Sequence, residues 1–253
     1  MPTPSLNRWG VVGYISPRIT KYTQFAMRIL TWNCNLNLKK KYELLESFEA
    51  DILIIQECEQ LPKNYFPNAD YFWIGKNEKK GLGVITRPGQ AQISSQHDPN
   101  LVYFLPVEFD DLHVLAVWAF NHRAARFGND AVGKPPQAIT QYQEWLGETE
   151  RGVVGGDFNN SVIWDKPRGD NRFSDINARL EELGFASSYH QSSSEEYGQE
   201  SATTLYHTKD QDKRYHIDYL YTKGLELENI EIGDYESWIA YSDHVPLVGD
   251  FKI

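Results

Sequence analysis

Four short polar motifs, each ending an apolar run, hold the residues of this chain that are best suited to chemistry. They are RILTWNCN ending at Asn35, DILIIQECE ending at Glu59, RGVVGGDFNN ending at Asn160, and YSDHVPLVGDF from Tyr241 to Phe251, and a fifth fragment, YHIDYLY, carries Asp218. The motifs put carboxylates, amides and one histidine where strands are expected to end, and α/β sheets hold their chemistry there. One such motif would carry little weight, but this set indicates a functional site.

Two of the motifs offer carboxylates at strand ends. Glu57 follows four apolar residues and Gln56, whereas Asp157 and Asn159 follow a Gly-Gly pair that permits close backbone approach. Residues two apart can project the same way, so Asp157 and Asn159 offer a general base or metal ligand beside an amide donor. Taken singly, such a Glu is usually a surface charge, and an Asp-x-Asn pair is more often a turn or a helix cap.

The adjacent pair Asp243 and His244 raises the question of what orients the imidazole. Neighbouring residues of a strand point to opposite faces, so Asp243 is a poor partner for His244. Asp218, from an adjacent strand, is the better candidate to fix the tautomer of the imidazole. For a single histidine, a hydrogen-bonded position in the core is the commoner alternative.

The combined donor set is rich in oxygen and poor in soft ligands. It comprises the carboxylates of Glu57, Asp157, Asp218 and Asp243 and the amides of Asn33 and Asn159. Such ligands suit Mg²⁺, Mn²⁺ or Ca²⁺ rather than zinc, and the sequence has no zinc-spaced Cys/His cluster, phosphate-binding GKS/GKT loop or GxSxG elbow. This chemistry fits phosphodiester hydrolysis, in which a metal polarises the phosphoryl oxygen, Asp157 activates water, and His244 and Asn159 stabilise the added charge.

The elements that must position these residues can be predicted from periodicity. Short apolar runs predict strands at 28–33, 51–56, 71–75, 82–86, 101–109, 112–120, 152–156, 203–206, 216–222, 225–233 and 245–252. Helical spacing predicts helices at 39–50, 137–150 and 174–185, the last capped by Ser174 and stopped by Gly184. Residues 190–201 are the segment most prone to disorder. Buried strands that alternate with helices, together with frequent strand–strand connections, favour a mixed-sheet α/β sandwich with helices outside.

Length and composition indicate one sizeable globular domain. The chain has 253 residues and two cysteines, so no disulfide framework is expected, and we interpret Cys34 and Cys58 as buried free thiols. No apolar run approaches the roughly 18 residues of a membrane span. Residues 1–26 lack the continuous apolar core of a secretory signal. We therefore expect a cytoplasmic protein without membrane contact, in which Met27 is a candidate alternative start.

The net charge of −10 disfavours a nonspecific nucleic-acid binder, because phosphate affinity rests on Lys and Arg. About half of the basic residues nevertheless follow the motif-bearing strands. They are Lys39, Lys40, Lys41, Lys76, Lys79, Lys80, Arg123, Arg126, Lys134, Lys166, Arg168 and Arg172. Such a basic rim would steer a phosphate substrate towards the site, and solvated surface charge is the equally weighted alternative.

With these motifs in place, the chain resembles the endonuclease/exonuclease/phosphatase superfamily, which includes DNase I-like nucleases, AP endonucleases, deadenylases, sphingomyelinases and inositol phosphatases. The resemblance runs from about residue 28 to residue 253. It implies a four-layer α/β sandwich with two central mixed β-sheets flanked by helices. Accordingly, we expect residues 1–27 to be an N-terminal extension and residues 28–253 to form the catalytic domain.

The resemblance also implies a role for each motif. TWNCN is similar to the motif that places Asn33 near phosphate and metal, and LIIQE to the motif whose Glu, here Glu57, binds the metal. GGDFN resembles the motif in which Asp157 orients the attacking water and Asn159 contacts phosphate. HIDYLY and SDHVPL resemble the motifs that pair Asp218 with the catalytic His244 and place Asp243 near the metal, which is expected to be Mg²⁺ or Mn²⁺.

Three positions depart from the family pattern. Trp118 stands where the family usually has His or Tyr; an indole only donates, so Asn121 or the neighbouring His122 takes that role or the site works without it. Asn35 replaces a common acidic metal ligand, which predicts weaker metal binding. His216 replaces an Arg and is either a second titrating group or a packed residue. The predicted substrate contacts are Trp118, Asn121, Arg123, Lys39 and Lys40.

The substrate is the least determined part of the prediction. The first hypothesis is a nuclease that acts on DNA or RNA, in which Trp73, Trp118 or Trp164 stack bases if they are not core residues. The second is a phosphatase or phosphodiesterase for a small phosphorylated molecule or lipid headgroup, and the third is a weakly active nucleic-acid-binding member. A long basic groove would favour a polymer, and a closed pocket a small substrate. A monomer is favoured.

Overall fold

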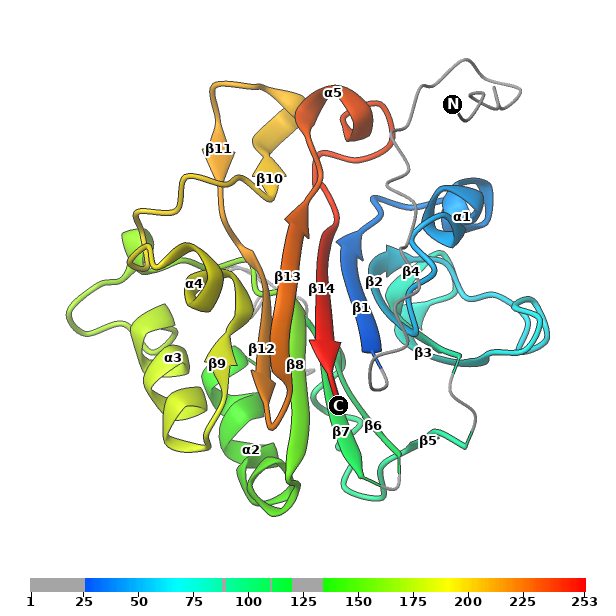
Figure 1. Ribbon diagram of the computed structural model, residues 1–253, viewed down its shortest axis with the longest axis horizontal. Helices are drawn as coiled ribbons and strands as arrows, with labels where there is room; N and C mark the ends of the chain where they lie inside the picture. The colour runs from blue at the N-terminus through cyan, green and yellow to red at the C-terminus, as the bar shows by residue number, and fades with distance from the viewer. Residues whose placement is uncertain (1–25, 88–89, 110, 120–133) are drawn as a thin grey trace.

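The computed structural model describes residues 26–87, 90–109, 111–119 and 134–253. In this part of the chain two six-stranded sheets pack against each other and helices lie on their outer sides (Figure 1). The helices are α1 (Leu38–Glu46), α2 (Pro135–Glu148), α3 (Phe173–Glu182), α4 (Ser188–Ser193) and α5 (Tyr235–Trp238), with 3₁₀ turns η2 (Val162–Trp164) and η3 (His207–Lys209). The predicted four-layer α/β sandwich is confirmed.

Sheet A holds both ends of the described chain. Its strands are, in spatial order, β13 (Glu226–Ile232), β14 (Leu247–Lys252), β1 (Ala26–Asn33), β2 (Ile52–Cys58), β4 (Lys80–Thr86) and β3 (Asp70–Asn77). Only β1 and β2 pair in parallel among these strands, and α1 makes the crossover between them. The parallel pair therefore ends in two motif segments at one edge.

Sheet B repeats this plan with a second parallel pair. Its strands are β5 (Gln92–Ile93), β6 (Phe104–Glu108), β7 (Leu112–Trp118), β8 (Arg151–Asp157), β12 (Asp218–Lys223) and β9 (Ala186–Ser187), and β10 (Leu205–Tyr206) with β11 (Arg214–Tyr215) forms a separate ribbon. Strands β7 and β8 are parallel, and the chain between them includes α2. Strands β8 and β12 are antiparallel, and Asp157, the last residue of β8, pairs with Asp218, the first residue of β12. Two motif carboxylates are therefore cross-strand neighbours.

Some strands consist almost entirely of apolar residues because both of their faces are buried. In β2, Ile52 and Ile54 pack in the core between the sheets, whereas Leu53 and Ile55 pack in the core beneath α1. A strand covered on both sides has no face for polar residues, which is why DILII is apolar throughout. The predicted hairpins at 71–86 and 101–120 are likewise present as β3–β4 and β6–β7 over the described residues.

The predicted cap of the third helix is wrong, although its end is correct. Helix α3 starts at Phe173, and its first amides are capped from outside: the carboxylate of Asp165 accepts hydrogen bonds from the backbone N–H of Phe173 (2.6 Å) and Ser174 (3.0 Å). Gly184, with φ 87°, follows the helix as predicted. Capping from Asp165 cannot be seen in the local sequence because the capping residue lies eight positions upstream.

The prediction that 190–201 is the segment most prone to disorder is also wrong. Its glutamates are tied back: His190 Nε2 and Glu200 Oε1 are 3.2 Å apart, and Glu195 accepts hydrogen bonds from the Tyr189 hydroxyl and the Ser201 N–H. These contacts hold in place polar side chains that the sequence suggests are solvated, and the side chains of His190 and Glu200 are nearly buried. Cys34 and Cys58 are, as predicted, free and buried.

Candidate active site

Unusual backbone geometry sets the motif residues in place. Asn35, Glu57 and Asn159 all have positive φ (47°, 58° and 46°), a region that asparagine tolerates and glutamate seldom enters. Glu57 is the extra residue of a β-bulge, because Gln56 pairs with Leu82 and Cys58 with Gly81. Strain of this kind persists where the surrounding fold holds it, and it concentrates at functional sites.

Gly156 shows why a glycine must precede Asp157. It has φ 141°, and a Cβ at this position would lie 1.8 Å from the carbonyl oxygen of Val117 on the neighbouring strand. Any side chain would push β8 away from β7, because the obstructing atom belongs to the backbone. The close approach lets the N–H of Ala119 donate to the carbonyl of Asp157 at 2.7 Å.

The imidazole of His244 is oriented from the opposite sheet. His244 precedes β14 of sheet A, and its Nδ1 lies 2.9 Å from Oδ2 of Asp218, the first residue of β12 in sheet B. Both side chains are almost fully buried. The carboxylate therefore fixes the tautomer and leaves Nε2 of His244 pointing at Asp157, whose Oδ2 is 4.0 Å away. The predicted pairing of Asp218 with His244 is present.

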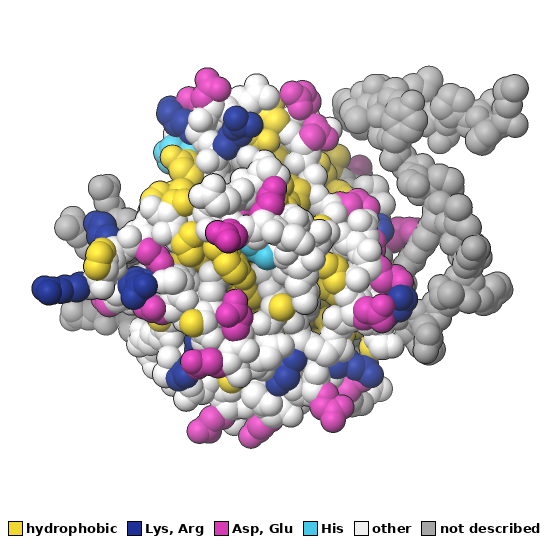
Figure 2. All heavy atoms as spheres, turned by 60° about the vertical axis from the view of Figure 1, so that its left-hand side comes forward, with side chains coloured by type: hydrophobic (Ala, Val, Ile, Leu, Met, Phe, Trp, Pro, Cys, Tyr) yellow, Lys and Arg dark blue, Asp and Glu magenta, His cyan; other side chains and the backbone are white. Residues whose placement is uncertain are grey.

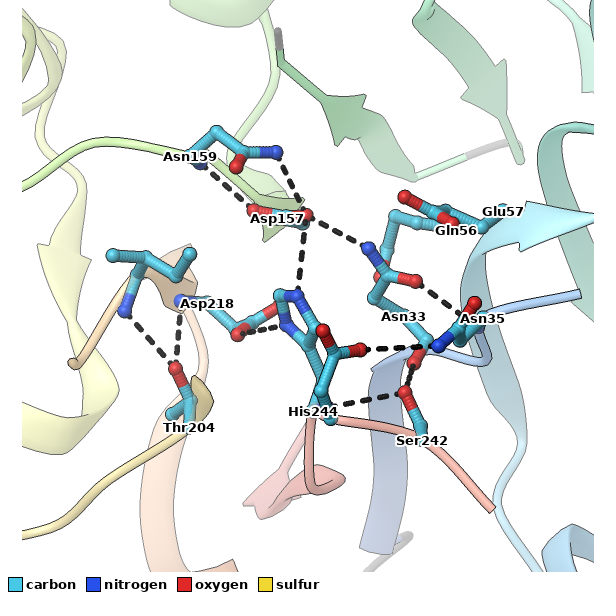
Figure 3. A network of polar contacts seen from close by, with 12 residues as sticks. Asn33, Asn35, Gln56, Glu57, Asp157, Asn159, Thr204, Asp218, Ser242 and His244 are labelled. Carbon is cyan, nitrogen blue, oxygen red and sulfur yellow. Dashed lines mark hydrogen bonds and ion pairs between the residues drawn. The ribbon is translucent and has the colours of Figure 1, made fainter. Parts of the chain in front are cut away.

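Asp157 is held by two amides (Figure 3). Its Oδ2 accepts from Asn33 Nδ2 and Asn159 Nδ2, both at 2.9 Å, and its Oδ1 accepts from the backbone N–H of Asn159 at 2.8 Å. Asn33 lies at the end of β1 in sheet A, so this contact also crosses the sandwich. Asn159 Nδ2 makes a further bond to the carbonyl of Ala119, which anchors the loop after β8.

Burial and charge shift the pKa values of this set. Burial, and then the negative charge of Asp218, raise the pKa of Asp157 to about 7. Burial lowers the pKa of His244, but the charges of Asp218 and Asp157 outweigh it and raise the pKa to about 10. At neutral pH the site thus holds a protonated imidazole beside a carboxyl group whose proton is readily exchanged.

A second oxygen-rich group lies next to this set. Asn35 Nδ2 contacts Asp243 Oδ1 at 3.3 Å, and Glu57 lies beside them, since its carbonyl accepts from the N–H of Leu36 at 3.0 Å (Figure 3). The ammonium of Lys80 lies 2.8 Å from Glu57 Oε2, so the site already accommodates one cation. Carboxylate and amide oxygens around such a position fit a divalent cation.

Three buried groups also lie within metal-binding distance of one another. Ligand atoms of Asp157, Asp218 and His244 are all within 4.8 Å among the described residues. Asp218 Oδ2 is bonded to His244, whereas its Oδ1 is buried and accepts no hydrogen bond among the described residues. The arrangement is better suited to holding and moving a proton than to coordinating an ion.

The predicted substrate contacts differ in their exposure to solvent. Trp118 pairs with Asp157 across the β7–β8 ladder, but it is 2 % exposed and packs edge-on against Tyr103. Lys39 and Lys40 are exposed on α1, where Lys39 lies 5.8 Å from the Tyr65 ring centre. Asn121, Arg123 and His122 lie outside the described residues.

Some residues of the basic rim are less free to bind a phosphate substrate than their positions in the sequence suggest. Lys41 is half-buried and donates to the carbonyls of Cys34, Asn35 and Tyr241, so its ammonium has a structural role. Figure 2 shows Lys and Arg side chains scattered among acidic ones on the face it displays, without a continuous basic stripe. His216 is packed: its Nδ1 meets the carbonyl of Ala202 at 3.0 Å, and burial lowers its pKa.

Two positioning residues were missed from the sequence. Thr204 Oγ1 accepts from the N–H groups of Ile217 and Asp218, at 3.0 and 3.1 Å, and so fixes the start of β12 (Figure 3). Ser242 Oγ donates to the carbonyl of Asn33 (2.7 Å) and accepts from the N–H of His244 (3.1 Å). Ser242 stands in the SDH motif and could have been considered, whereas nothing adjacent to Thr204 marks it.

A pocket opens beside Asn159. It has a volume of about 890 Å³, and its lining includes the 3₁₀ turn η2, Asn160, Arg172, Tyr215 and Ile217. Trp164 is 42 % exposed and its ring lies 5.1 Å from that of Tyr215. Because Asn159 contacts both Asp157 and this pocket, a group bound there would lie next to the buried carboxylate.

The fold is a two-sheet α/β sandwich, and its candidate site holds a buried His–Asp pair, a second carboxyl group and amides. The chain belongs to the endonuclease/exonuclease/phosphatase family, whose model matches residues 30–244. Enzymes of this family are phosphoesterases, and this chain is a hydrolase of that type. No curated protein sequence matches the chain.

Solved structures share the fold at low sequence identity. A 3′ phosphatase from Neisseria bound to a product DNA hairpin matches with 18% identity and a TM-score of 0.67, and a 3′-5′ exonuclease from Neisseria meningitidis with 17% and 0.68. An AP endonuclease from Archaeoglobus fulgidus matches with 16% and 0.62. Each match covers 90% of this chain and 100% of the other. No helix among the described residues is long and apolar enough to cross a membrane.

Proposed function

We propose that this protein is a divalent-metal-dependent phosphodiester hydrolase, and most specifically a nuclease that acts on DNA or RNA. The observation that carries the proposal is the buried contact set in which Asp218 orients His244 at 2.9 Å and Asn33 and Asn159 both donate to Asp157 at 2.9 Å. A carboxyl group that can exchange a proton at neutral pH, next to a fixed imidazolium and amide donors, suits attack of water on phosphorus.

The roles follow from the geometry. Asp157 takes the proton of the attacking water, since its pKa of about 7 puts its charged and neutral forms in balance. His244, held by Asp218, presents Nε2–H to the charge that develops on the phosphoryl oxygens. The amides of Asn33 and Asn159 keep the Asp157 carboxylate pointed at the reaction centre.

Mg²⁺ or Mn²⁺ would be held by Glu57, with Asp243 and Asn35 completing the oxygen ligands. When bound, such an ion supplies polarisation of the phosphoryl oxygen. The three residues come from the ends of β1 and β2 and from the loop before β14, beside the Asp157 and His244 set. Asn35 in place of an acidic ligand leaves two carboxylates, which is expected to weaken the affinity for the ion.

The pocket beside Asn159 favours a nucleotide as the group next to the reacting phosphate. Its volume of about 890 Å³ and its apolar and aromatic lining, with Trp164 exposed, suit a sugar or a base. Lys166 and Arg172 are among the residues that line it and can meet a neighbouring phosphate. The DNA-directed activities of the structurally similar proteins agree with this substrate class.

A small phosphoester is the second candidate, and the shape of the site favours it. The described residues line a pocket beside Asn159, and on the face that Figure 2 displays the cations are scattered and form no long basic groove. A polymer needs several phosphate contacts for affinity. A phosphatase acting on a small molecule or on a terminal phosphate needs only the pocket and the metal.

The deciding experiment compares cleavage of supercoiled plasmid, labelled single-stranded DNA and RNA, and a 3′-phosphorylated oligonucleotide in Mg²⁺, Mn²⁺ and EDTA. Asp157→Asn serves as the blank. Metal-dependent cleavage that the variant lacks supports a nuclease. Release of phosphate from the oligonucleotide end without internal cleavage supports the phosphatase, and no turnover of any phosphoester by the folded protein contradicts both.

A further inference from the structure

Lys80 occupies a position that the chemistry of the site does not yet explain. It is the first residue of β4, and its ammonium lies 2.8 Å from Glu57 Oε2. The ammonium also lies 5.3 Å from the ring centre of Trp118, across the sandwich on β7. The carboxylate of Glu57 is therefore neutralised by a residue of this chain.

The backbone next to Lys80 is closely packed. Gly81, the next residue, pairs with Cys58 directly after the bulged residue Glu57, and a Cβ on Gly81 would meet the carbonyl oxygen of Ile74 at 2.3 Å. The side chain of Lys80 is 39 % exposed, so solvent is open to it, whereas Glu57 is 20 % exposed.

We propose that Lys80 is an internal competitor for the metal ligand Glu57: a divalent cation must displace its ammonium to bind. The inference rests on the proposed function, because it takes Glu57 as a metal ligand. The ammonium contacts Oε2 of Glu57, and a divalent cation on either oxygen of this carboxylate would lie close to it, where like charges repel. Lys80 thereby lowers metal affinity and keeps Glu57 neutralised until the ion arrives.

Displacement costs little because the freed ammonium has other favourable surroundings. It can remain over the face of the Trp118 ring, where a cation is attracted to the π-electrons, or turn into solvent. In this arrangement the Trp118 indole holds the ammonium of Lys80 and does not contact the substrate. This role explains why a buried tryptophan pairs with Asp157 across the β7–β8 ladder.

The test is a calorimetric titration of the full-length protein with MgCl₂ in the absence of substrate. Lys80→Met is expected to lower the dissociation constant about two- to fivefold, the effect of removing one partly exposed competing charge. Lys80→Arg keeps the positive charge and should bind Mg²⁺ much as the unaltered protein does. Lys79→Met removes an exposed charge from the same hairpin and should also change nothing.

The sign of the change separates competition from a structural role. If Lys80 only supported the fold, its loss would weaken metal binding, and equal or weaker binding by Lys80→Met would overturn the inference. Thermal melts without metal show that each variant is folded, and Lys80→Gln repeats the test with a different neutral side chain.

The same titration separates failure of the inference from failure of the proposed function. Unaltered protein that binds Mg²⁺, with Glu57→Gln that does not, upholds the metal site whatever Lys80 does. Unaltered protein that binds no divalent cation would overturn both the metal requirement and the role of Lys80.

Discussion

At the scale of single residues, the site depends on charges kept away from water. Asp157 is fully buried, and its neighbours Asp218 and His244 are nearly so. Each charge in such a place changes the protonation of the next, because little water screens them. The three side chains therefore act as a unit, and altering one changes the other two.

Removing the charge of Asp218 tests this coupling. Asp218→Asn should lower kcat about 10²- to 10⁴-fold, because the amide no longer holds the required tautomer or stabilises the imidazolium of His244. The decline of kcat at high pH should also begin at a lower pH than in the unaltered protein, because the charge of Asp218 helps to raise the pKa of His244 to about 10. Hydrolysis of bis(4-nitrophenyl) phosphate across pH checks both, and an unchanged profile in folded protein would contradict the role of Asp218.

Asp157 should make the protein less stable as the pH rises. The pKa of Asp157 is about 7 in the folded protein and 3.8 when the chain is unfolded. Between pH 3.8 and pH 7 the folded protein therefore binds this proton more tightly than the unfolded chain does. Stability is thus highest below pH 4 for this group and falls as the pH rises through 7, by of order 4 kcal/mol in total. Chemical unfolding at pH 5 and pH 8 should show a smaller loss for Asp157→Asn than for the unaltered protein; the loss that remains comes from His244, whose raised pKa acts in the same direction.

The matched control is Asp212→Asn, an exposed aspartate remote from the buried set. It should follow the pH dependence of the unaltered protein. An Asp157→Asn protein whose stability fell just as steeply between the two pH values would show that Asp157 is already charged at pH 5.

At the scale of elements, capping from distant residues fixes the helices near the site. Glu59 caps α1, since its carboxylate accepts from the N–H groups of Leu38 (2.6 Å) and Lys39 (3.0 Å), and Asp165 caps α3. In both helices an acidic side chain occupies the N-terminus that an anion would otherwise favour. These two termini are therefore not phosphate sites.

Asp165→Ala should cost about 0.5–2 kcal/mol of stability through the lost cap of α3. For a protein of this length that lowers Tm by roughly 2–6 °C, measurable by circular dichroism. Because Asp165 also lines the pocket beside Asn159, the affinity for a nucleotide should fall as well. A Tm equal to that of Asp212→Ala would show that the cap contributes nothing.

The pattern of apolar residues predicts where helices and strands occur better than it predicts the residues at which they begin and end. Strands such as 51–56 are recognisable because burial on both faces demands continuous apolar residues. The contacts of Asp218 with His244 could be anticipated from strand geometry, but those of Asp165, Thr204 and Lys80 could not, since each depends on residues brought together by the fold. The burial of Trp118 could not be predicted either, because the sequence shows an aromatic residue but not its exposure.

At the scale of the whole molecule, the net charge of −10 acts against a polyanionic substrate. The proposed metal ion and a few cations near the pocket would have to overcome this repulsion. Binding of nucleic acid is thus expected to be weak without metal and to involve few phosphates.

Salt dependence measures this directly. Fluorescence anisotropy of a labelled oligonucleotide with Asp157→Asn protein in Mg²⁺ should give a shallow slope of log affinity against log salt, corresponding to about two or three phosphate contacts. Replacing Lys39 and Lys40 by Ala tests their predicted contact with phosphate: both are exposed on α1, and a slope that stays unchanged would remove them from the substrate contacts. A steep slope, or one that flattens in this variant, would restore the basic rim as a polymer-binding surface.

The hydrogen bonds from Asn33 to Asp157 and from His244 to Asp218 both run from sheet A to sheet B. Neither sheet therefore holds the whole buried set, and a fragment that contained only one sheet would be inert. A slip of one sheet over the other by a single residue, about 3.3 Å, would break both links at once. Hydrolytic activity is in this sense a direct report on whether the two halves of the sandwich are correctly docked.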